Sequence, residues 1–286
     1  MSKIQSIEVA HVSIPLDQIT SFSTRTVHER HYCLVKVSNV DGVQGIGFCY
    51  VGSAAGAITK VAVEQLLAPK LIGQESHRSA GLWEEMYAES LLQGRAGSVM
   101  RAISILDNAI WDMNARAAQL PLHHYLGAVV NDRVPAYASG GYYLDGKTPS
   151  HLAKEMLSYV TKGFRAVKMK TGRLSPREEE ERLRAVRDAV GDDIIVTLDA
   201  NNAWHDLPTA MEYIKRFEQY NPYWIEEPFS PDAIDLHARL ASRTSITVAT
   251  GEIEAGRWRH RELLESEACE ILQTDAAVCG GITEWR

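Results

Sequence analysis

A repeated strand–helix pattern, running from about residue 133 to the end of the chain, limits the possible fold more than any other feature. Short apolar segments predict strands at 134–138, 166–170, 194–198, 223–225, 246–249 and 270–273. Helices are predicted between them, at 150–161, 176–190, 207–220, 231–242 and 258–266. This alternation predicts a parallel sheet covered by helices, either closed as a barrel or open and doubly wound. No Gly-x-Gly-x-x-Gly motif opens a helix after the first strand, which argues against a dinucleotide site.

The first half of the chain has a different pattern. Residues up to about 50 are predicted to form β structure, with a hairpin turn at Asp41-Gly42 and a polar loop over 18–28. Residues 55–126 are predicted to be mainly helical, and the clearest helix has one apolar face made by Ile103, Leu106, Ile110, Met113 and Ala117. Asp107 and Asp112 lie on that helix, and we interpret both as structural polar groups.

Composition excludes several classes of protein. The chain has 286 residues, 45% of them hydrophobic, and a net charge of -7 without a basic run, so nucleic acid is not an expected partner. No apolar segment reaches the roughly 18 residues that a membrane span needs, and the N-terminus lacks the apolar core of a signal peptide. The four cysteines are scattered, which predicts free thiols in a reducing cytoplasm.

Two lysines share one face at the end of a predicted strand. In the segment Ala166-Val167-Lys168-Met169-Lys170, strand alternation places Lys168 and Lys170 on the same side. Two neighbouring ammonium groups repel each other, and burial disfavours both charges. Either this strand emerges into water, or nearby anions compensate the pair.

Acidic residues end the strands that follow. These acids are Asp199, Glu226, Glu252 and Asp275. They are spaced about one strand–helix unit apart, so parallel strands would bring them to the same rim of the sheet as the two lysines. Each acid alone could be a helix cap or a surface charge. Together they suggest a cation site, because converging carboxylates repel one another unless a cation lies between them. Oxygen ligands without Cys or clustered His favour Mg²⁺, with Mn²⁺ or Ca²⁺ as substitutes, over zinc.

These motifs resemble those of the enolase superfamily, in particular its mandelate racemase-like subgroup. The resemblance is carried by Lys168-Met169-Lys170, Leu198-Asp199-Ala200-Asn201, Trp224-Ile225-Glu226-Glu227-Pro228, Thr250-Gly251-Glu252, Asp275 with Gly280-Gly281, and the helix from Ala102 to Asp112. It extends over essentially the whole chain. It implies an α/β fold: a modified TIM barrel of the (β/α)7β type, truncated after about six strands, with an N-terminal α+β capping domain. We expect the capping domain at 1–128 and the partial barrel domain at 129–286.

The resemblance also implies roles for the rim residues. Asp199, Glu226 and Glu252 would bind Mg²⁺, and Glu227 is expected to point away from its neighbour Glu226. Lys170 would be the base that moves the proton α to a substrate carboxylate. Lys168 would neutralise a carboxylate oxygen and lower the basicity of Lys170. Fixed cations would stabilise the negative charge that develops on the resulting enediolate.

The segment after the sixth strand distinguishes subgroups. It carries no lysine, unlike relatives of muconate-lactonising enzymes, and Asp275 matches the aspartate that orients a histidine in mandelate racemase-like enzymes. That histidine would lie beyond Arg286. We therefore expect the 286 residues to be part of a longer chain.

The expected substrate is a small carboxylate. The loop from Ser21 to His28 and a second loop near Tyr50 and Ser53 would close over the site and supply hydrogen-bonding groups. The predicted substrate-binding residues are Ser21, Thr24, His28, Tyr50, Ser139 and Asn201. A polar pocket fits a polyhydroxylated acid better than an aromatic one. We therefore expect an acid-sugar dehydratase, a lyase that converts an aldonate or aldarate to a 2-keto-3-deoxy acid.

Two other functions stay open at this point. The same residues could serve a racemase, epimerase or cycloisomerase acting on a hydroxy acid or a sugar-acid lactone, or the chain could be a non-catalytic binding protein or inactive fragment. For partners we expect a homo-oligomer, without nucleic acid or membrane.

Overall fold

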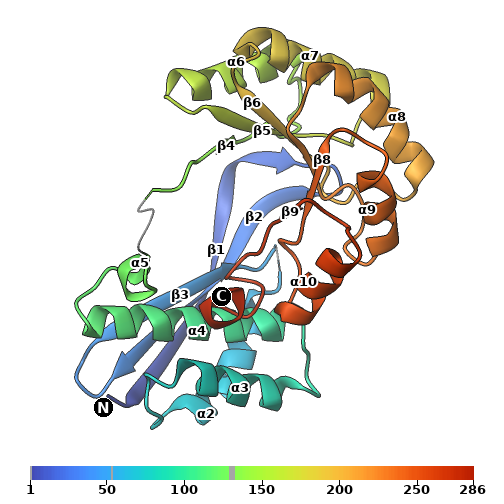
Figure 1. The fold of residues 1–286 in the computed structure, drawn as a ribbon. Coiled ribbons are helices and arrows are strands. Elements are labelled where there is room, and N and C mark those ends of the chain that lie inside the picture. The colour runs from blue at the N-terminus through green and yellow to red at the C-terminus, as the bar shows by residue number, and fades with distance from the viewer. Residues whose placement is uncertain (1, 53, 129–132) are drawn as a thin grey trace.

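Figure 1 shows the computed structural model of the protein, which describes residues 2–52, 54–128 and 133–286. The described residues form two sheets. One is an antiparallel sheet near the N-terminus, and the other is a parallel sheet of six strands. Helices of the N-terminal half pack on the first sheet, and helices of the C-terminal half cover the second.

The N-terminal sheet has three strands in the order β1 (Ile4–Ser21), β2 (Thr26–Asn39) and β3 (Gln44–Tyr50). The predicted hairpin at Asp41-Gly42 is confirmed, since it joins β2 to β3. The prediction of a polar loop over 18–28 is wrong. Thr20 pairs with Val27 and Ser21 with Thr26, so both strands extend into this segment and only residues 22–25 lie between them. The hydroxyl-bearing β-branched residues that suggested a loop are also good strand formers.

The predicted helical region is confirmed. It contains α1 (Gly56–Val61), a π-helical turn η1 (Ala62–Leu67), α2 (Ala68–Leu71), α3 (Ser79–Ser90), α4 (Gly97–Ala117) and α5 (Leu122–Tyr125). The apolar face of α4 packs on the sheet. Gly45 and Gly47 of β3 permit this contact, because a side chain at either position would collide with backbone atoms of α4.

The parallel sheet follows chain order. Its strands are β4 (Ala138–Ser139), β5 (Ala166–Lys170), β6 (Ile195–Asp199), β7 (Trp224–Glu226), β8 (Thr247–Thr250) and β9 (Ile271–Leu272). A doubly wound sheet would not keep sequential order. The order therefore supports the predicted barrel-type sheet, which curves as an arc in Figure 1.

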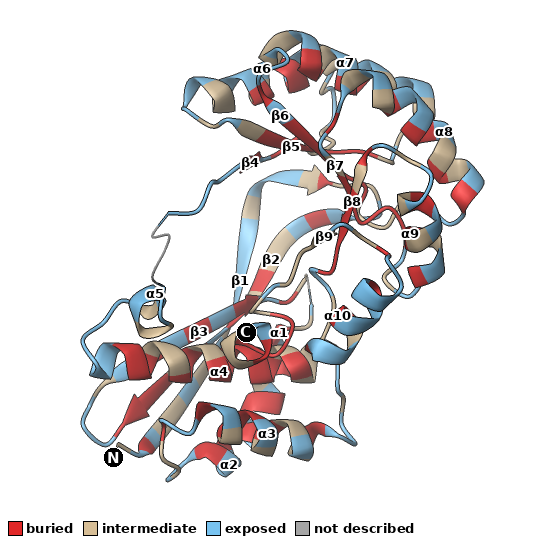
Figure 2. Ribbon diagram, viewed as in Figure 1, coloured by how far each residue is buried: buried red, intermediate tan, exposed pale blue. Residues whose placement is uncertain are grey.

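Helices cover the convex side of this arc. They are α6 (Pro149–Thr161), α7 (Pro176–Val190), α8 (Leu207–Phe217) with the 3₁₀ turn η2 (Glu218–Tyr220), α9 (Ile234–Ala241) and α10 (Gly256–Glu265). The buried residues in Figure 2 concentrate on the strands and on the helix faces turned toward them. The strands are thus covered on their outer side, as expected for a barrel wall.

The predicted strand at 134–138 is wrong over most of its length. Val134 is 88% exposed, and only Ala138 and Ser139 pair with β5. Pro135 has no backbone N–H to donate to a ladder, which disfavours a longer strand.

The predicted domain boundary at 128/129 adjoins residues 129–132, which lie outside the described residues, and it stays a prediction.

The end of the chain returns to the N-terminal half through the short helix α11 (Ile282–Trp285). Thr283 donates to the buried carboxylate of Asp107 through its backbone N–H at 2.8 Å and its hydroxyl at 2.6 Å. Asp112 accepts from the backbone N–H of Ile46 and from Arg116. Both aspartates therefore have structural contacts, in line with our interpretation of them.

No helix among the described residues is long and apolar enough to cross a membrane.

Candidate active site

A cavity of about 600 Å³ lies between the N-terminal sheet and the carboxyl ends of the barrel strands. The N-terminal half contributes residues of the loop after β1, of β2 and β3, and of α4 to its wall. The barrel contributes polar and charged residues at or just after the ends of β5 to β9: Lys170, Asn201, Asn202, Glu227, Glu252 and Asp275. In Figure 1 the far ends of β1 and β2 reach the barrel sheet, and the backbone of Ser21 pairs there with Tyr143.

Strand register aligns three of the predicted residues. Lys170 pairs with Asp199 across β5 and β6, and Asp199 pairs with Glu226 across β6 and β7. Side chains in register on neighbouring parallel strands point to the same face. The three functional groups therefore form one row at the carboxyl end of the sheet, as the sequence predicts.

The lysines of β5 are buried and paired with these carboxylates. The Lys168 ammonium lies 2.6 and 2.7 Å from the two carboxylate oxygens of Glu226, and the Lys170 ammonium lies 2.5 Å from Oδ2 of Asp199. Each lysine is only 7% exposed, so the alternative of a strand end emerging into water is wrong. Burial acts to lower the pKa of Lys168, but the charges of Asp199 and Glu226 outweigh it and raise the pKa overall.

Aromatic rings surround the ammonium groups. Lys168 Nζ lies 5.5 Å from the ring centre of Tyr137, and Lys170 Nζ lies 5.4 Å from that of Tyr142 and 5.7 Å from that of Phe22. Phe22 belongs to the loop after β1. The N-terminal half therefore contacts Lys170 directly and helps to exclude water from it.

Two further carboxylates make the site acidic. Burial, together with Glu252, Asp199 and Glu226, raises the pKa of Glu227 to about 8. Desolvation, together with the negative charges of Glu226 and Asp199, raises the pKa of Glu252. Its side chain lines the cavity. Four carboxyl groups thus share the site with two ammonium groups, and the raised pKa values express the repulsion among the acids.

That Glu227 points away from its neighbour Glu226 stays a prediction, but strand alternation does not support it. β7 ends at Glu226, and Glu227 takes a left-handed backbone conformation with φ of 44°, so strand alternation does not apply to it. Its carboxylate lines the cavity. A strained backbone of this kind at a non-glycine residue is typical of functional sites.

The donor set fits a hard divalent cation. Among the described residues, no three His, Cys, Asp or Glu side chains form a preassembled metal cluster. The candidate ligands Asp199 and Glu226 are instead bonded to the lysines. The excess of carboxyl groups over ammonium groups nevertheless provides the oxygen donors that Mg²⁺ prefers.

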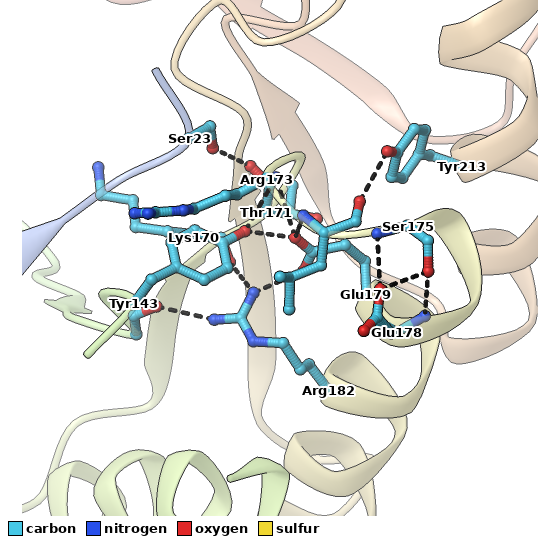
Figure 3. A network of polar contacts seen from close by, with 12 residues as sticks. Ser23, Tyr143, Lys170, Thr171, Arg173, Ser175, Glu178, Glu179, Arg182 and Tyr213 are labelled. Atoms are coloured by element: carbon cyan, nitrogen blue, oxygen red, sulfur yellow. Dashed lines mark hydrogen bonds and ion pairs between the residues drawn. The ribbon is translucent and has the colours of Figure 1, made fainter. Parts of the chain in front are cut away.

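A buried polar network holds the end of β5 from the other side (Figure 3). Arg182 of α7 donates to the backbone carbonyls of Lys170 and Gly141, and it pairs with Glu179, which is fully buried. Ser23 of the loop after β1 donates to the carbonyl of Thr171. These contacts fix the backbone at Lys170 and attach that loop to it.

The predicted substrate-binding residues divide into two groups. Thr24, Tyr50 and Asn201 line the cavity, as does Asp275, whose carboxylate accepts from the backbone N–H of Ala277 at 2.7 Å. Asn201 adopts φ of 47° and its Oδ1 is buried without a partner among the described residues, so it has capacity for a ligand hydrogen bond.

The other predicted residues are not among those that line the cavity. Ser21 is bonded to Thr26 and lies by a neighbouring, smaller cavity next to Tyr143. His28 is exposed and follows Val27, which does line the cavity, so alternation turns His28 to the opposite face. Ser139 is exposed on β4 beside Lys168. Ser53 lies outside the described residues.

Several lining residues escaped the sequence predictions: Arg30, Tyr32, Arg101, Tyr142 and Asn202. Arg30 and Tyr32 are two residues apart on β2 and so share a face, which is a signal that the sequence contains. Arg101 lies between the buried residues Met100 and Ala102, and nothing in the helical pattern shows that this end of α4 reaches the cavity.

Family comparisons cover both halves of the chain. Residues 4–127 match the mandelate racemase / muconate lactonizing enzyme N-terminal domain, and residues 151–286 match the enolase C-terminal domain-like family. Arabinonate dehydratase of Saccharolobus solfataricus is 34% identical over 257 residues, which are 90% of this chain and 68% of that protein. L-talarate/galactarate dehydratase of Salmonella typhimurium is 34% identical over 251 residues, 87% of this chain and 62% of that protein.

Other relatives have a different activity or contain a metal. D-galactarolactone cycloisomerase of Agrobacterium fabrum is 30% identical over 283 residues, 99% of this chain and 73% of that protein. A solved structure of a mutant L-talarate/galactarate dehydratase, liganded with Mg and L-glucarate, superposes with a TM-score of 0.93 at 30% identity. It is matched over 99% of this chain and 72% of that chain. The predicted barrel fold with an N-terminal capping part is thereby confirmed.

Proposed function

Since the chain belongs to the mandelate racemase / muconate lactonizing enzyme family of the enolase superfamily, we propose that it removes the proton α to a substrate carboxylate. The reaction that we propose is dehydration of an acid sugar, an aldonate or an aldarate, to a 2-keto-3-deoxy acid. Dehydratases acting on arabinonate and on L-talarate or galactarate are among its relatives. The family supports an activity in the area of lyases and isomerases.

One observation carries this proposal. Lys170, Asp199 and Glu226 stand in register at the carboxyl ends of neighbouring parallel strands, where Lys170 lines a cavity. Proton abstraction next to a carboxylate needs a base, and it needs positive charge near the carboxylate to stabilise the anion that forms. This row of residues supplies a base and the ligands for such a charge.

We propose Mg²⁺ as the cofactor, held by Asp199, Glu226 and Glu252. When bound, it would stabilise the negative charge that develops on the substrate carboxylate. The support is the set of carboxyl oxygen donors that Asp199, Glu226 and Glu252 bring to the ends of neighbouring strands, and the bound Mg in solved relatives.

The two lysines have different positions and therefore different proposed roles. Lys170 lines the cavity, so its amine takes the α-proton; loss of the β-hydroxyl as water then gives an enol that becomes the 2-keto-3-deoxy acid. Lys168 lies deeper, against Glu226, and contributes fixed positive charge behind the reacting carboxylate. Lowered basicity of Lys170 through Lys168 stays a prediction, as does the orienting role of Asp275.

A cycloisomerase is the second candidate, because D-galactarolactone cycloisomerase matches 99% of the chain at 30% identity. The products separate the two candidates. A dehydratase loses one water and forms a 2-keto acid that reacts with semicarbazide, whereas an isomerase forms a product of unchanged mass.

The experiment is a screen of aldonates, aldarates and sugar-acid lactones with Mg²⁺, analysed for both kinds of product. A keto acid supports the dehydratase, and an isomer of unchanged mass replaces it by the isomerase. If no member of the panel reacts, the proposed reaction is wrong.

We also propose a homo-oligomer in the cytoplasm. The four cysteines are free, which suits a reducing compartment. Light scattering on the purified protein would test the oligomer.

A further inference from the structure

Three arginines line the side of the cavity that the N-terminal half provides. Arg25 comes from the loop after β1, Arg30 from β2 and Arg101 from α4. They are separated in sequence and belong to three different elements. The fold therefore places three positive charges on the part of the cavity wall that the N-terminal half supplies, whereas the carboxyl groups come from the barrel.

None of the three guanidinium groups forms an ion pair with a carboxylate of the described residues. Arg25 stacks over the ring of Phe22 at 5.6 Å, and Arg101 donates to the backbone carbonyl of Tyr50 at 3.0 Å. Arg30 lies beside the side chains of Tyr32 and Tyr142. Each group thus keeps N–H donors that neutral partners do not use up, because a guanidinium has five.

Uncompensated cations on a cavity wall are suited to bind an anion, and a planar guanidinium matches a carboxylate best. The first carboxylate of an acid sugar belongs on the barrel side of the cavity, near Lys170, under the function proposed above. A second carboxylate is not expected to share that side, because the carboxyl groups of Glu227, Glu252 and Asp275 already line it. The arginine wall offers it a place.

We propose that the substrate is a dicarboxylic sugar acid, an aldarate, whose distal carboxylate binds to Arg25, Arg30 and Arg101. This inference rests on the proposed function and narrows its substrate class. The cavity of about 600 Å³ has room for a chain of several hydroxylated carbons between the two walls. The hydroxyls then face the amides and phenols in between, such as Asn201, Tyr32 and Tyr142.

The test compares matched substrates. An aldarate and the aldonate of the same configuration differ only in the terminal carbon, so the ratio of their kcat/KM values reports the distal carboxylate alone. We expect the aldarate to be preferred. Arg30→Gln and Arg101→Gln should each lower this ratio on the order of 10- to 100-fold, the size expected for a lost charge-assisted hydrogen bond.

A matched control is Arg177→Gln, since the side chain of Arg177 on α7 is 82% exposed and is paired with Glu181. It should leave the ratio unchanged. Arg25→Gln provides a variant with little risk to folding, because Arg25 is exposed. An equal preference for both acids, or a ratio that the arginine variants do not change, would overturn the inference. A terminally phosphorylated aldonate forms the third arm, and its preference over the aldarate would overturn it too.

Calorimetric binding of the same acids separates this inference from the proposed function. If no acid reacts but the aldarate binds more tightly than the aldonate and loses this advantage in Arg101→Gln, the inference holds and the proposed reaction fails. If both acids react equally in all variants, the proposed reaction holds and the inference fails. If neither acid binds, both are wrong.

Discussion

Replacement of Lys168 by Met tests the electrostatics of the site. Glu226 is fully buried, and both of its oxygens accept from the Lys168 ammonium, at 2.6 and 2.7 Å. In Lys168→Met the hydrogen bond left to this carboxylate among the described residues is the indole N–H of Trp224, at 3.2 Å. Removing one partner of a buried ion pair costs about 3–5 kcal/mol, because the other charge stays buried without compensation. We expect the free energy of unfolding to fall by this amount.

The assay is urea unfolding at neutral pH without divalent cations. Lys70→Met is the matched control: Lys70 pairs with Glu89 at 2.8 Å, but the two side chains are 49% and 33% exposed. An exposed pair contributes less than about 1 kcal/mol. The double variant Lys168→Met/Glu226→Gln removes the buried charge as well and should regain much of the lost stability.

The reasoning would be refuted if Lys168→Met lost no more stability than Lys70→Met. It would also be refuted if the added Glu226→Gln change brought no recovery, since the cost would then come from packing and not from charge.

The remaining predictions concern the base and two buried acids. Lys170→Ala should abolish turnover and leave calorimetric Mg²⁺ binding intact; persistent turnover would show that another group is the base. Burial raises the pKa of Asp107 to about 7 from 3.8, so the folded protein keeps a proton that the unfolded chain has lost. Stability should therefore fall as the pH rises from about 4 to about 7, by up to ~4 kcal/mol. Urea unfolding at several pH values measures this decrease, which Asp107→Asn should abolish and Asp112→Asn should leave in place. An unchanged pH dependence in Asp107→Asn would contradict the prediction. Glu179→Gln leaves buried Arg182 without its counter-charge and should cost about 3–5 kcal/mol of unfolding free energy; a loss below about 1 kcal/mol would show that the network is solvated.

Elements with strong local signals could be predicted from the sequence with accurate bounds. Strand β5 spans the predicted 166–170, and α7 spans the predicted 176–190. The helix begins with Ser175 as N-cap, Pro176 and the capping box with Glu178, and it ends at Gly191 with φ of 77°. Here the local preferences of the chain agree with its tertiary contacts.

The rim row was predictable for a similar reason. A strand–helix unit has a nearly constant length, so acids at the ends of strands fall in register with Lys170. The local backbone at Glu227 was not predictable, because its φ of 44° follows from where β7 ends and not from the residue type.

Contacts between segments that are distant in the sequence could not be predicted from the sequence either. The sequence does not show that Arg101 of α4 and Arg30 of β2 face the same cavity as Lys170. It also misplaced His28, because the supposed loop is the start of a strand and alternation applies to it. Such positions depend on how the two sheets pack together.

The most direct test of the central claim is exchange of the substrate α-hydrogen in D₂O, followed by NMR across a panel of acid sugars. The claim is that Lys170 and the carboxylates of Asp199, Glu226 and Glu252 form a metal-dependent site of proton abstraction. We predict exchange with at least one acid sugar, dependent on Mg²⁺ and absent in Lys170→Ala. Exchange that persists without a divalent cation or in Lys170→Ala, or no exchange with any acid sugar, would contradict this account.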